Sequence, residues 1–521
     1  MDIRHAIMEQ LKELVLLVSR SKLKALEDMD FLFNKETKLT KIYQSIADEE
    51  WKSEDELIQH LYPSSSRGES IDSYRHLKAT LIQRLTNLLF LTDVNQASYS
   101  KYQRAYYECH KNWAAIQVLL GKNAQTAAIE LAEKTLQYAK KYEFTELNCG
   151  ICKILRLYYA TREGDYARFA CYNDQYKQYK IIRDLESEVE EYYLLLVINY
   201  VNDRSEKEDI QHKAKQYYDA IEDYLNSYDS YNLHLYGYLI KLMIYTTVND
   251  YSSTIQVCEE GIRFFSQKDF KAHVPLQIFY YQKMVCHIQL KEIPEGEATA
   301  RKCLSLLEEG SFNWFKYHEL YFSLHINSKE YQGAYRLYQR VTHHNRCRFL
   351  PDNVKEVWRI YQAYLYYLME HGAIEVDSTD NVFSKFRLGR FLNETPTYSK
   401  DKRGMNIAIL IIHILFFILK KKYNKTIDRV EAIQQYSYRY LHQDNTYRSN
   451  CFIKMLLLIP KANFHKVAVI RKTKPYLQKL QKVPLEVDKQ SYEVEIIPYE
   501  DLWEFVLNSL DKDFEPVSST A

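Results

Sequence analysis

The segment "EYQGAYRLYQRV", residues 330–341, follows the short polar turn "NSK" and places a small residue between two large rings. With 3.6 residues per helical turn, Tyr331, Ala334 and Tyr338 fall on one face of a helix. A small side chain on that face lets the preceding antiparallel helix approach closely. The segment therefore predicts the second helix of a helix hairpin.

This arrangement occurs six times along the chain, each time as a helix, a polar turn and a second helix with a close-packing position near its start. The predicted close-packing positions are Ala128, Phe169, Ala214, Thr254, Gly296 and Ala334. They are separated by 41, 45, 40, 42 and 38 residues. A recurring period of about 40 residues in an all-helical pattern is typical of an α-solenoid, in which each hairpin packs on its neighbours.

Glycine and proline are rare, with 12 glycines and 10 prolines in 521 residues. Together they make up about 4% of the chain, against roughly 12% of an average protein. These residues punctuate sheets and tight turns, so their scarcity favours helices joined by short polar turns. The 47 tyrosines indicate helix interfaces filled with large rings whose hydroxyls still reach water or a partner. The sequence thus predicts an all-α fold.

The repeats resemble the tetratricopeptide-repeat family. In residues 330–341, Tyr331, Ala334 and Tyr338 stand where that family's second helix has an aromatic, a small residue and another aromatic. In "NDYSSTIQVCEEGI", residues 249–262, the corresponding positions are Tyr251, Thr254, Cys258 and Gly261. The resemblance covers roughly residues 98–372, with a period longer than the family's usual length of about 34 residues. It implies a tetratricopeptide-like α-solenoid of antiparallel hairpins, with a groove that binds a peptide or helix.

These patterns divide the chain into five predicted segments. Residues 1–95 predict a helical N-terminal cap, which a solenoid needs because an end repeat would expose its apolar face. Residues 96–372 hold the helical repeats, and residues 373–404, rich in turn-forming residues, predict an irregular connection. Residues 405–510 predict a basic helical C-terminal block, and residues 511–521 predict a disordered tail.

The most apolar stretch is "NIAILIIHILFFILKKK", residues 406–422. From Ile407 to Leu419 it would form a helix roughly 20 Å long, whereas a membrane span must cross roughly 30 Å of hydrocarbon. The stretch therefore predicts a buried core helix and no membrane span. His413, which lies among isoleucines, is interpreted as a core histidine that is hydrogen-bonded to a carbonyl.

Basic residues are concentrated in the C-terminal block. Residues 385–485 contain 21 Lys and Arg against 5 Asp and Glu, a net charge of +16, whereas the whole chain carries +1 and the remainder therefore −15. Three interpretations are open: the block docks on the acidic repeats of its own chain, presents a solvated basic face, or binds nucleic acid or another polyanion. The candidate polyanion contacts are Lys400, Lys402, Arg403, Lys420, Lys421, Lys422, Arg471, Lys472 and Lys474.

Adjacent tyrosines occur on the first helices of several repeats, as in Tyr158–Tyr159 and Tyr192–Tyr193. Neighbouring helix positions point about 100° apart, so one ring can pack between repeats while the other faces a groove. The alternative is that both rings serve helix packing. Because tyrosine is enriched in protein interfaces, we select one set of rings as candidate partner contacts. They are Tyr159, Tyr193, Tyr236, Tyr281 and Tyr321.

No motif for catalysis or cofactor binding occurs in the sequence. There is no G-x-x-x-x-G-K-[ST] loop, no G-x-G-x-x-G turn and no G-x-S-x-G elbow. Cys149 and Cys152 match the C-x-x-C spacing of redox pairs and zinc half-sites, but they fall in a helical stretch without a second pair. We interpret them as small residues on one helix face. His343, His344 and Cys347 lack convincing further ligands nearby, so no metal site is expected.

The sequence predicts a protein that is not an enzyme and that uses no cofactor. Nine scattered cysteines, an odd number in a long chain, disfavour a secreted disulfide framework. The first residues contain no apolar run long enough for a signal peptide. We therefore expect a cytoplasmic interaction scaffold or adaptor that binds a protein or peptide through its solenoid groove. The alternative is a nucleic-acid-associated regulator or sensor that uses residues 385–485.

Overall fold

The computed structural model describes residues 10–11, 13–15, 18, 37–47, 54–63, 67–90, 99–202, 207–376, 383, 386–393, 405–440, 447–483 and 495–510. Regular secondary structure in these residues consists of helices, and they contain no strand. The predicted all-α fold is confirmed. The chain forms two compact units, Met1–Arg183 and Asp184–Ala521, whose boundary falls within helix α8 (Tyr166–Asn202).

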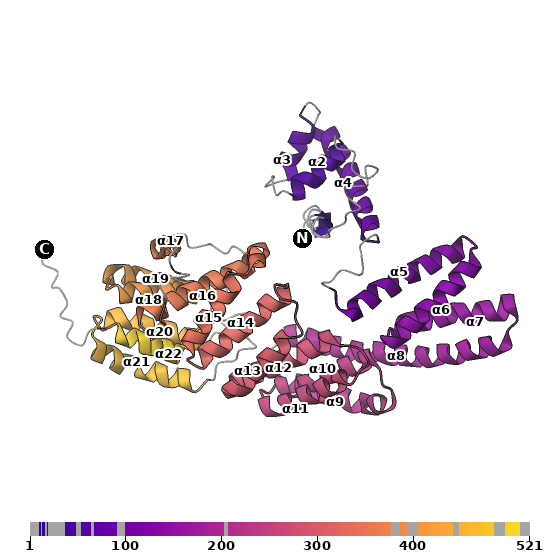
Figure 1. The fold of residues 1–521 in the computed structure, drawn as a ribbon. Helices are drawn as coiled ribbons and strands as arrows, with labels where there is room; N and C mark the ends of the chain where they lie inside the picture. Colours follow the sequence, from indigo (N-terminus) through magenta and orange to yellow (C-terminus); the bar gives the residue numbers. More distant parts are fainter. Residues whose placement is uncertain are drawn as a thin grey trace. The chain divides into compact units, whose positions relative to one another are not determined.

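The first unit contains short helices near its N-terminus and then longer consecutive helices. They are α2 (Lys38–Ala47), α3 (Glu54–Leu61), α4 (Arg67–Leu89), α5 (Lys101–Gly121), α6 (Gln125–Lys141), α7 (Thr145–Tyr158), the π-helical turn η2 (Tyr159–Glu163) and the first part of α8. Helices α2, α3 and α4 share an apolar core that includes Ile42, Leu57 and Leu81. Helices α5, α6 and α7 pack in sequence order as antiparallel neighbours (Figure 1).

The second unit continues with helix hairpins and ends in a helical bundle. Its helices after α8 are α9 (Lys207–Ser227), α10 (Tyr231–Thr246), α11 (Tyr251–Ser266), α12 (His273–Leu290), α13 (Ile293–Leu304), α14 (Phe312–Asn327), α15 (Tyr331–Thr342), the 3-10 turn η3 (Asn345–Phe349), α16 (Asp352–Glu370), α17 (Leu388–Asn393), α18 (Met405–Leu419), α19 (Tyr423–Tyr440), α20 (Tyr447–Lys461), α21 (Lys466–Gln481) and α22 (Tyr499–Asn508). Helix α17 lies in the segment predicted to be an irregular connection. The predicted tail, residues 511–521, lies outside the described residues.

The hairpin turns repeat one backbone conformation. A residue with a left-handed φ near +60° ends the first helix of four hairpins: Asn123 (61°), Asn249 (60°), Lys291 (59°) and Lys329 (61°). In each case the next residue's N–H donates back to a carbonyl five residues earlier, as Asp250 does to Tyr245 and Glu330 to His325. Such turns satisfy carbonyls left free at a helix end. The same turn also follows α6 at Glu143 (57°) and α18 at Lys421 (53°), so it is a general helix-ending turn of this chain and is compatible with a helical repeat.

Close-packing positions follow these turns, largely as predicted. Ala128, Thr254 and Ala334 are each the fourth residue of their helix and are fully buried. At Gly296, a Cβ atom would lie only 3.0 Å from the Leu324 Cδ1 atom of the next hairpin. Phe169 differs, because its ring is only half-buried on α8. A small or tightly buried residue therefore holds the helices together at most, but not all, of the six positions.

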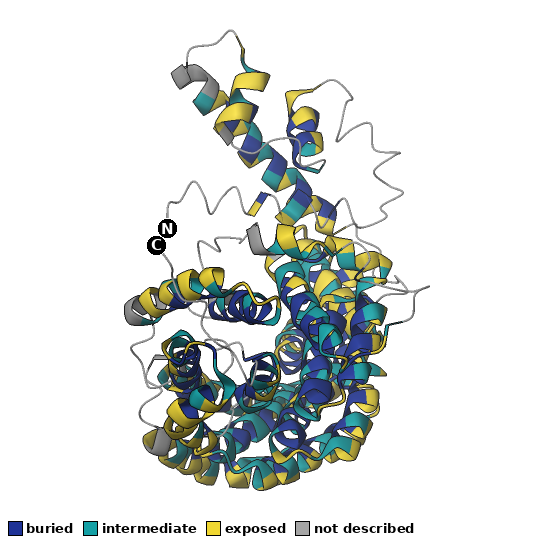
Figure 2. Ribbon diagram, turned by 90° about the vertical axis from the view of Figure 1, so that its left-hand side faces the viewer, coloured by how far each residue is buried: buried dark blue, intermediate teal, exposed yellow. Residues whose placement is uncertain are grey.

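The C-terminal bundle contains the largest apolar core. Helix α18 contributes Ile411, Ile412 and Leu415 to this core, which also receives side chains from α15, α16, α20 and α22. Figure 2 shows buried residues turned toward the space between packed helices, with exposed residues on the outside. The prediction of a buried helix at residues 407–419 is confirmed. Within the described part of the chain, we found no helix with both the length and the apolarity that a bilayer span requires.

Candidate functional site

The second unit opens with hairpins rich in tyrosine and carboxylate groups, formed by α8 from Asp184 onward, α9 and α10. Residues 184–230 contain 13 Asp and Glu against 4 Lys and Arg, a net charge of −9. The apolar core of these helices is small, with eight buried residues, and partly buried tyrosines surround it. The tyrosines are Tyr192, Tyr193, Tyr200, Tyr217, Tyr218, Tyr224, Tyr228, Tyr236 and Tyr245. This shell presents large, rigid rings with polar tips, the kind of contact area that protein interfaces favour.

Two of the predicted partner contacts meet in this shell. The rings of Tyr193 on α8 and Tyr236 on α10 lie 5.7 Å apart between centroids. The Tyr236 hydroxyl donates a hydrogen bond of 2.8 Å to the Glu190 carboxylate. Burial and this hydrogen bond raise the pKa of Tyr236 to about 12, so the hydroxyl stays a proton donor at any physiological pH. The Glu190 carboxylate thus orients the Tyr236 ring.

A second tyrosine pair joins α8 to α9. Tyr192 stacks on Tyr217 of α9 with ring centroids 4.5 Å apart and planes inclined by 3°. Its hydroxyl donates a 2.7 Å hydrogen bond to Glu188, which together with burial raises the pKa of Tyr192 to about 12. Tyr192 therefore packs on α9 through its ring, while a carboxylate of its own helix fixes its hydroxyl.

The outer face of α8 carries exposed aliphatic side chains. Val189 and Leu196 face the core, and helix geometry places Leu194, Leu195 and Ile198 on the opposite side. All three are exposed, Ile198 by 54%. Exposed Glu191 lies among them on the same face. We call Glu190, Glu191, Tyr193, Leu194, Leu195, Ile198 and Tyr236 the acidic surface.

The other predicted partner tyrosines lie elsewhere. Tyr281 on α12 is exposed, and Tyr321 on α14 stacks on His325 with ring centroids 4.7 Å apart. Tyr159 lies in the first unit and is only 4% exposed. Its hydroxyl donates to Glu133 at 2.8 Å and accepts from Arg168 at 2.7 Å. Of the five candidate tyrosines, Tyr193 and Tyr236 are therefore the two whose rings contact each other.

Helices α20 and α21 form a surface of opposite charge. Residues 447–483 contain nine Lys and Arg and no Asp or Glu. Three of the predicted polyanion contacts, Arg471, Lys472 and Lys474, are exposed on α21. Two aliphatic side chains are exposed among them, Val467 by 61% and Ile470 by 44%. We call Lys461, Lys466, Val467, Ile470, Arg471, Lys472 and Lys474 the basic surface.

The lysine triplet after α18 lies near one end of the basic surface. Tyr423, directly after this triplet, packs on Phe464 in the turn between α20 and α21, with ring centroids 4.3 Å apart. The side chains of Lys421 and Lys422 are exposed beside this contact, whereas Lys420 forms an ion pair with Glu370. The remaining predicted contacts, Lys400, Lys402 and Arg403, lie outside the described residues.

Arg448 is the exception among the basic residues of α20, because it is buried. Its guanidinium donates to Glu495 at 3.0 and 2.8 Å and to Glu500 at 3.0 and 2.7 Å. A further hydrogen bond of 3.1 Å reaches the Leu480 carbonyl. Burial alone would lower the pKa of Arg448, but the two carboxylates raise it, so the group stays charged. Arg448 thus joins α20, α21 and α22 beneath the basic surface and takes no part in that surface.

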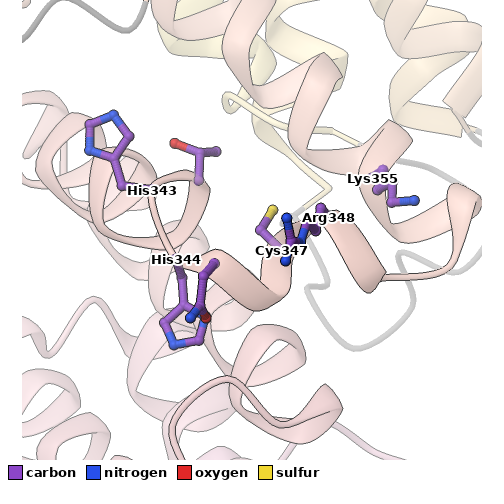
Figure 3. A pocket seen from close by; sticks show the side chains of 7 residues that line it. His343, His344, Cys347, Arg348 and Lys355 are labelled. Atoms are coloured by element: carbon purple, nitrogen blue, oxygen red, sulfur yellow. The ribbon is translucent and has the colours of Figure 1, made fainter. Parts of the chain in front are cut away.

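An open basin of about 520 Å³ lies between α15 and α16, lined by Thr342, His343, His344, Asn345, Cys347, Arg348 and Lys355. Figure 3 shows that the rings of His343 and His344 point away from each other. The His344 ring packs on Trp314, with centroids 5.3 Å apart, and its Nδ1 atom accepts a hydrogen bond from the Arg346 N–H. Burial raises the pKa of the Cys347 thiol, which disfavours the reactive thiolate. The lining groups do not converge on one point where a ligand would react.

The other candidates for chemistry serve the core. Cys149 and Cys152 are buried on α7, and burial raises the pKa of Cys152 to about 12. His413 is fully buried, and burial lowers its pKa to about 4. Neither ring nitrogen of His413 has a partner in good hydrogen-bond geometry within the described residues, but the Phe391 backbone lies close enough to oppose part of the lowering of its pKa. Within the same residues, no group of three His, Cys, Asp or Glu side chains is placed to hold a metal.

The exposed aliphatic side chains of both surfaces were missed by the sequence reasoning. The run "YYLLLVINY", residues 192–200, is apolar all round, so the sequence does not show which side faces the core. On α21, the sequence alone would assign Val467 and Ile470 to the core because they are apolar. In the structure Val469 is the residue that packs into the core, and Val467 and Ile470 are exposed. Comparisons with protein-family models, curated proteins and solved structures gave no match to this chain.

Proposed function

We propose that this protein is a non-catalytic interaction scaffold of tetratricopeptide-like hairpins, and that its acidic surface binds a protein partner. The proposal depends on one observation: exposed Leu194, Leu195 and Ile198 lie on α8, and Leu194 is one helical turn after Glu190, the carboxylate that holds the Tyr236 ring. Apolar side chains at the centre of a patch with a polar rim are the usual anatomy of a protein interface. Tyr236 adds a ring whose orientation is already set by Glu190, so little entropy is lost on binding.

The side chains of the acidic surface indicate which kind of partner fits it. Leu194, Leu195 and Ile198 would contact an apolar side chain of the partner, and Glu190 and Glu191 would pair with basic side chains around it. A helix or peptide that carries both matches this surface. The recurring hairpins serve to hold the surface on rigid elements, which is how repeat proteins present binding sites.

The proposal is tested by capture from an extract of the native host with the full chain immobilised. The test variant is Leu194→Ser/Ile198→Ser, and the matched control is Leu157→Ser, which changes an exposed leucine on α7. We expect the wild type and the control to retain a protein that the double variant loses, while all three keep the same melting temperature. If the three proteins capture the same set, the acidic surface is not the binding site.

A further inference from the structure

The acidic and basic surfaces are opposite in charge but alike in apolar content. Each has exposed aliphatic side chains among charged groups: Leu194, Leu195 and Ile198 on α8, and Val467 and Ile470 on α21. The surrounding segments carry −9 over residues 184–230 and +9 over residues 447–483. Each surface therefore has the chemistry that the other requires.

A single chain does not bury these side chains against each other. Ile198 and Val467 remain 54% and 61% exposed in the folded chain. Docking of the C-terminal block on the acidic repeats of its own chain was one interpretation of the charge pattern. The block packs on α15 and α16 of its own chain, with Lys420 paired to Glu370, and both surfaces stay exposed to a second molecule.

We propose that the basic surface of one copy docks on the acidic surface of a second copy. This inference rests on the proposed function, because it names the partner of the acidic surface. In the contact, the aliphatic side chains of α21 cover the stripe on α8, and Lys466, Arg471 and Lys474 face Glu190 and Glu191. The charged pairs set the orientation and speed the encounter, and the aliphatic contact supplies the apolar burial.

The two halves of this contact come from different parts of the chain, so the interface is heterologous. In a pair of bound copies, the acidic surface of one copy and the basic surface of the other remain unoccupied. Further copies can therefore add head to tail, unless the assembly closes into a ring. A nucleic acid would use the cations but would leave Val467 and Ile470 without an apolar partner. The second copy uses both the charges and the aliphatic side chains, and it accounts for both surfaces at once.

The test is sedimentation velocity of the nuclease-treated full chain over a range of concentrations. We expect reversible assembly that weakens about tenfold or more when the salt is raised from about 50 to about 500 mM, since screening removes the attraction between exposed charges. Two variants place the opposite charge on one surface each. The first is Ser187→Lys/Glu191→Lys, at Glu191 and at the exposed residue one turn before it on α8, and the second is Arg471→Glu/Lys474→Glu on α21. Each variant alone should remain monomeric. An equimolar mixture should assemble again, because each variant supplies the intact surface that the other lacks.

Other outcomes overturn the proposal. These are a wild type that is monomeric at every concentration and salt, a mixture that does not assemble, and assembly that disappears on nuclease treatment. Retention on anionic phospholipid vesicles without self-association would also overturn it, and would assign the basic surface to a membrane. If self-association fails but Leu194→Ser/Ile198→Ser still loses a captured protein, the inference falls and the proposed function stands.

Discussion

The two charged regions of the second unit are built in different ways. The acidic hairpins, α8 to α10, have a small core of eight buried residues, and half-buried tyrosines complete their packing. The C-terminal bundle has a large core in which whole faces of α18 and α20 are buried, together with Trp503 of α22. Most of its basic side chains are exposed on α20 and α21, whereas Arg448 is buried and paired with two carboxylates.

This difference bears on the binding role proposed for each region. In the acidic hairpins the tyrosines that pack the helices also belong to the acidic surface, so variants of this surface are expected to change both stability and the proposed binding. In the bundle the core and the surface are separate, because Val469 and Leu480 face inward from α21 while Arg471 and Lys474 face outward. Surface variants of the bundle should therefore be tolerated better than variants of the tyrosine shell.

The largest expected effect would break the C-terminal bundle at Arg448. Arg448→Met keeps most of the side-chain volume but leaves Glu495, which is fully buried, without its counter-charge. Removing one partner of a buried ion pair costs about 3–5 kcal/mol, so we expect a loss of that size in the free energy of unfolding. Denaturant unfolding followed by tryptophan fluorescence measures it. Arg471→Met on the exposed face is the control and should change stability by less than about 0.5 kcal/mol.

The second prediction concerns the pH dependence of stability in the C-terminal bundle, which contains the buried His413. His413 is neutral in the folded bundle with a pKa of about 4, against about 6.5 in an unfolded chain. As the pH falls below about 6.5 the unfolded state binds a proton first, so stability is lost until the pH reaches about 4. Over this range we expect the wild type to lose about 3 kcal/mol more than His413→Leu. Parallel pH profiles of the two proteins would contradict the assignment.

The third prediction concerns the hairpins between the two regions. A Cβ atom at Gly261 of α11 would lie 2.9 Å from the Phe279 ring of α12, so Gly261→Ala forces the helices apart. Overpacking of this kind costs about 1–3 kcal/mol. Thermal unfolding measures the loss. Gly121→Ala, at a position with no atom within 4 Å of the added Cβ, is the control and should be neutral or slightly stabilising.

The smallest effect is expected in the tyrosine shell. Tyr236→Phe removes the hydroxyl that binds Glu190 but keeps the ring that faces Tyr193. We expect a loss of about 0.5–1.5 kcal/mol in stability, and weaker capture of the partner because the ring orientation is no longer fixed. Tyr138→Phe on α6, an exposed tyrosine, is the control. Equal behaviour of the two variants would show that the hydroxyl of Tyr236 has no special role.

Features that depend on local periodicity could be predicted from the sequence. The buried helix at residues 407–419 and the small residues Ala128, Thr254 and Ala334 follow from apolar spacing and side-chain size, which act within one hairpin. Features that depend on contacts between residues far apart in the sequence could not be predicted. Arg448 meets Glu495 and Glu500 from 47 and 52 residues away, and nothing in the local sequence marks it as buried.

The candidate site illustrates the same limit. Tyr193 and Tyr236 were both predicted as partner contacts, but their contact with each other depends on how α8 and α10 rotate about their axes. That rotation is set by the small core around Val189 and Ile240, whose helices are apolar on several sides. Tyr159 belongs to a similar sequence pattern, yet its hydrogen bonds to Glu133 and Arg168 hold it in the interior.

The pairing of Arg448 has a consequence for how the molecule is made. Glu495 follows Arg448 by 47 residues and Glu500 follows it by 52, so a chain that ends before residue 495 holds this cation without either acidic partner. A buried charge without its partner is strongly destabilising. Helices α20 and α21 can therefore close over Arg448 only when synthesis has reached α22.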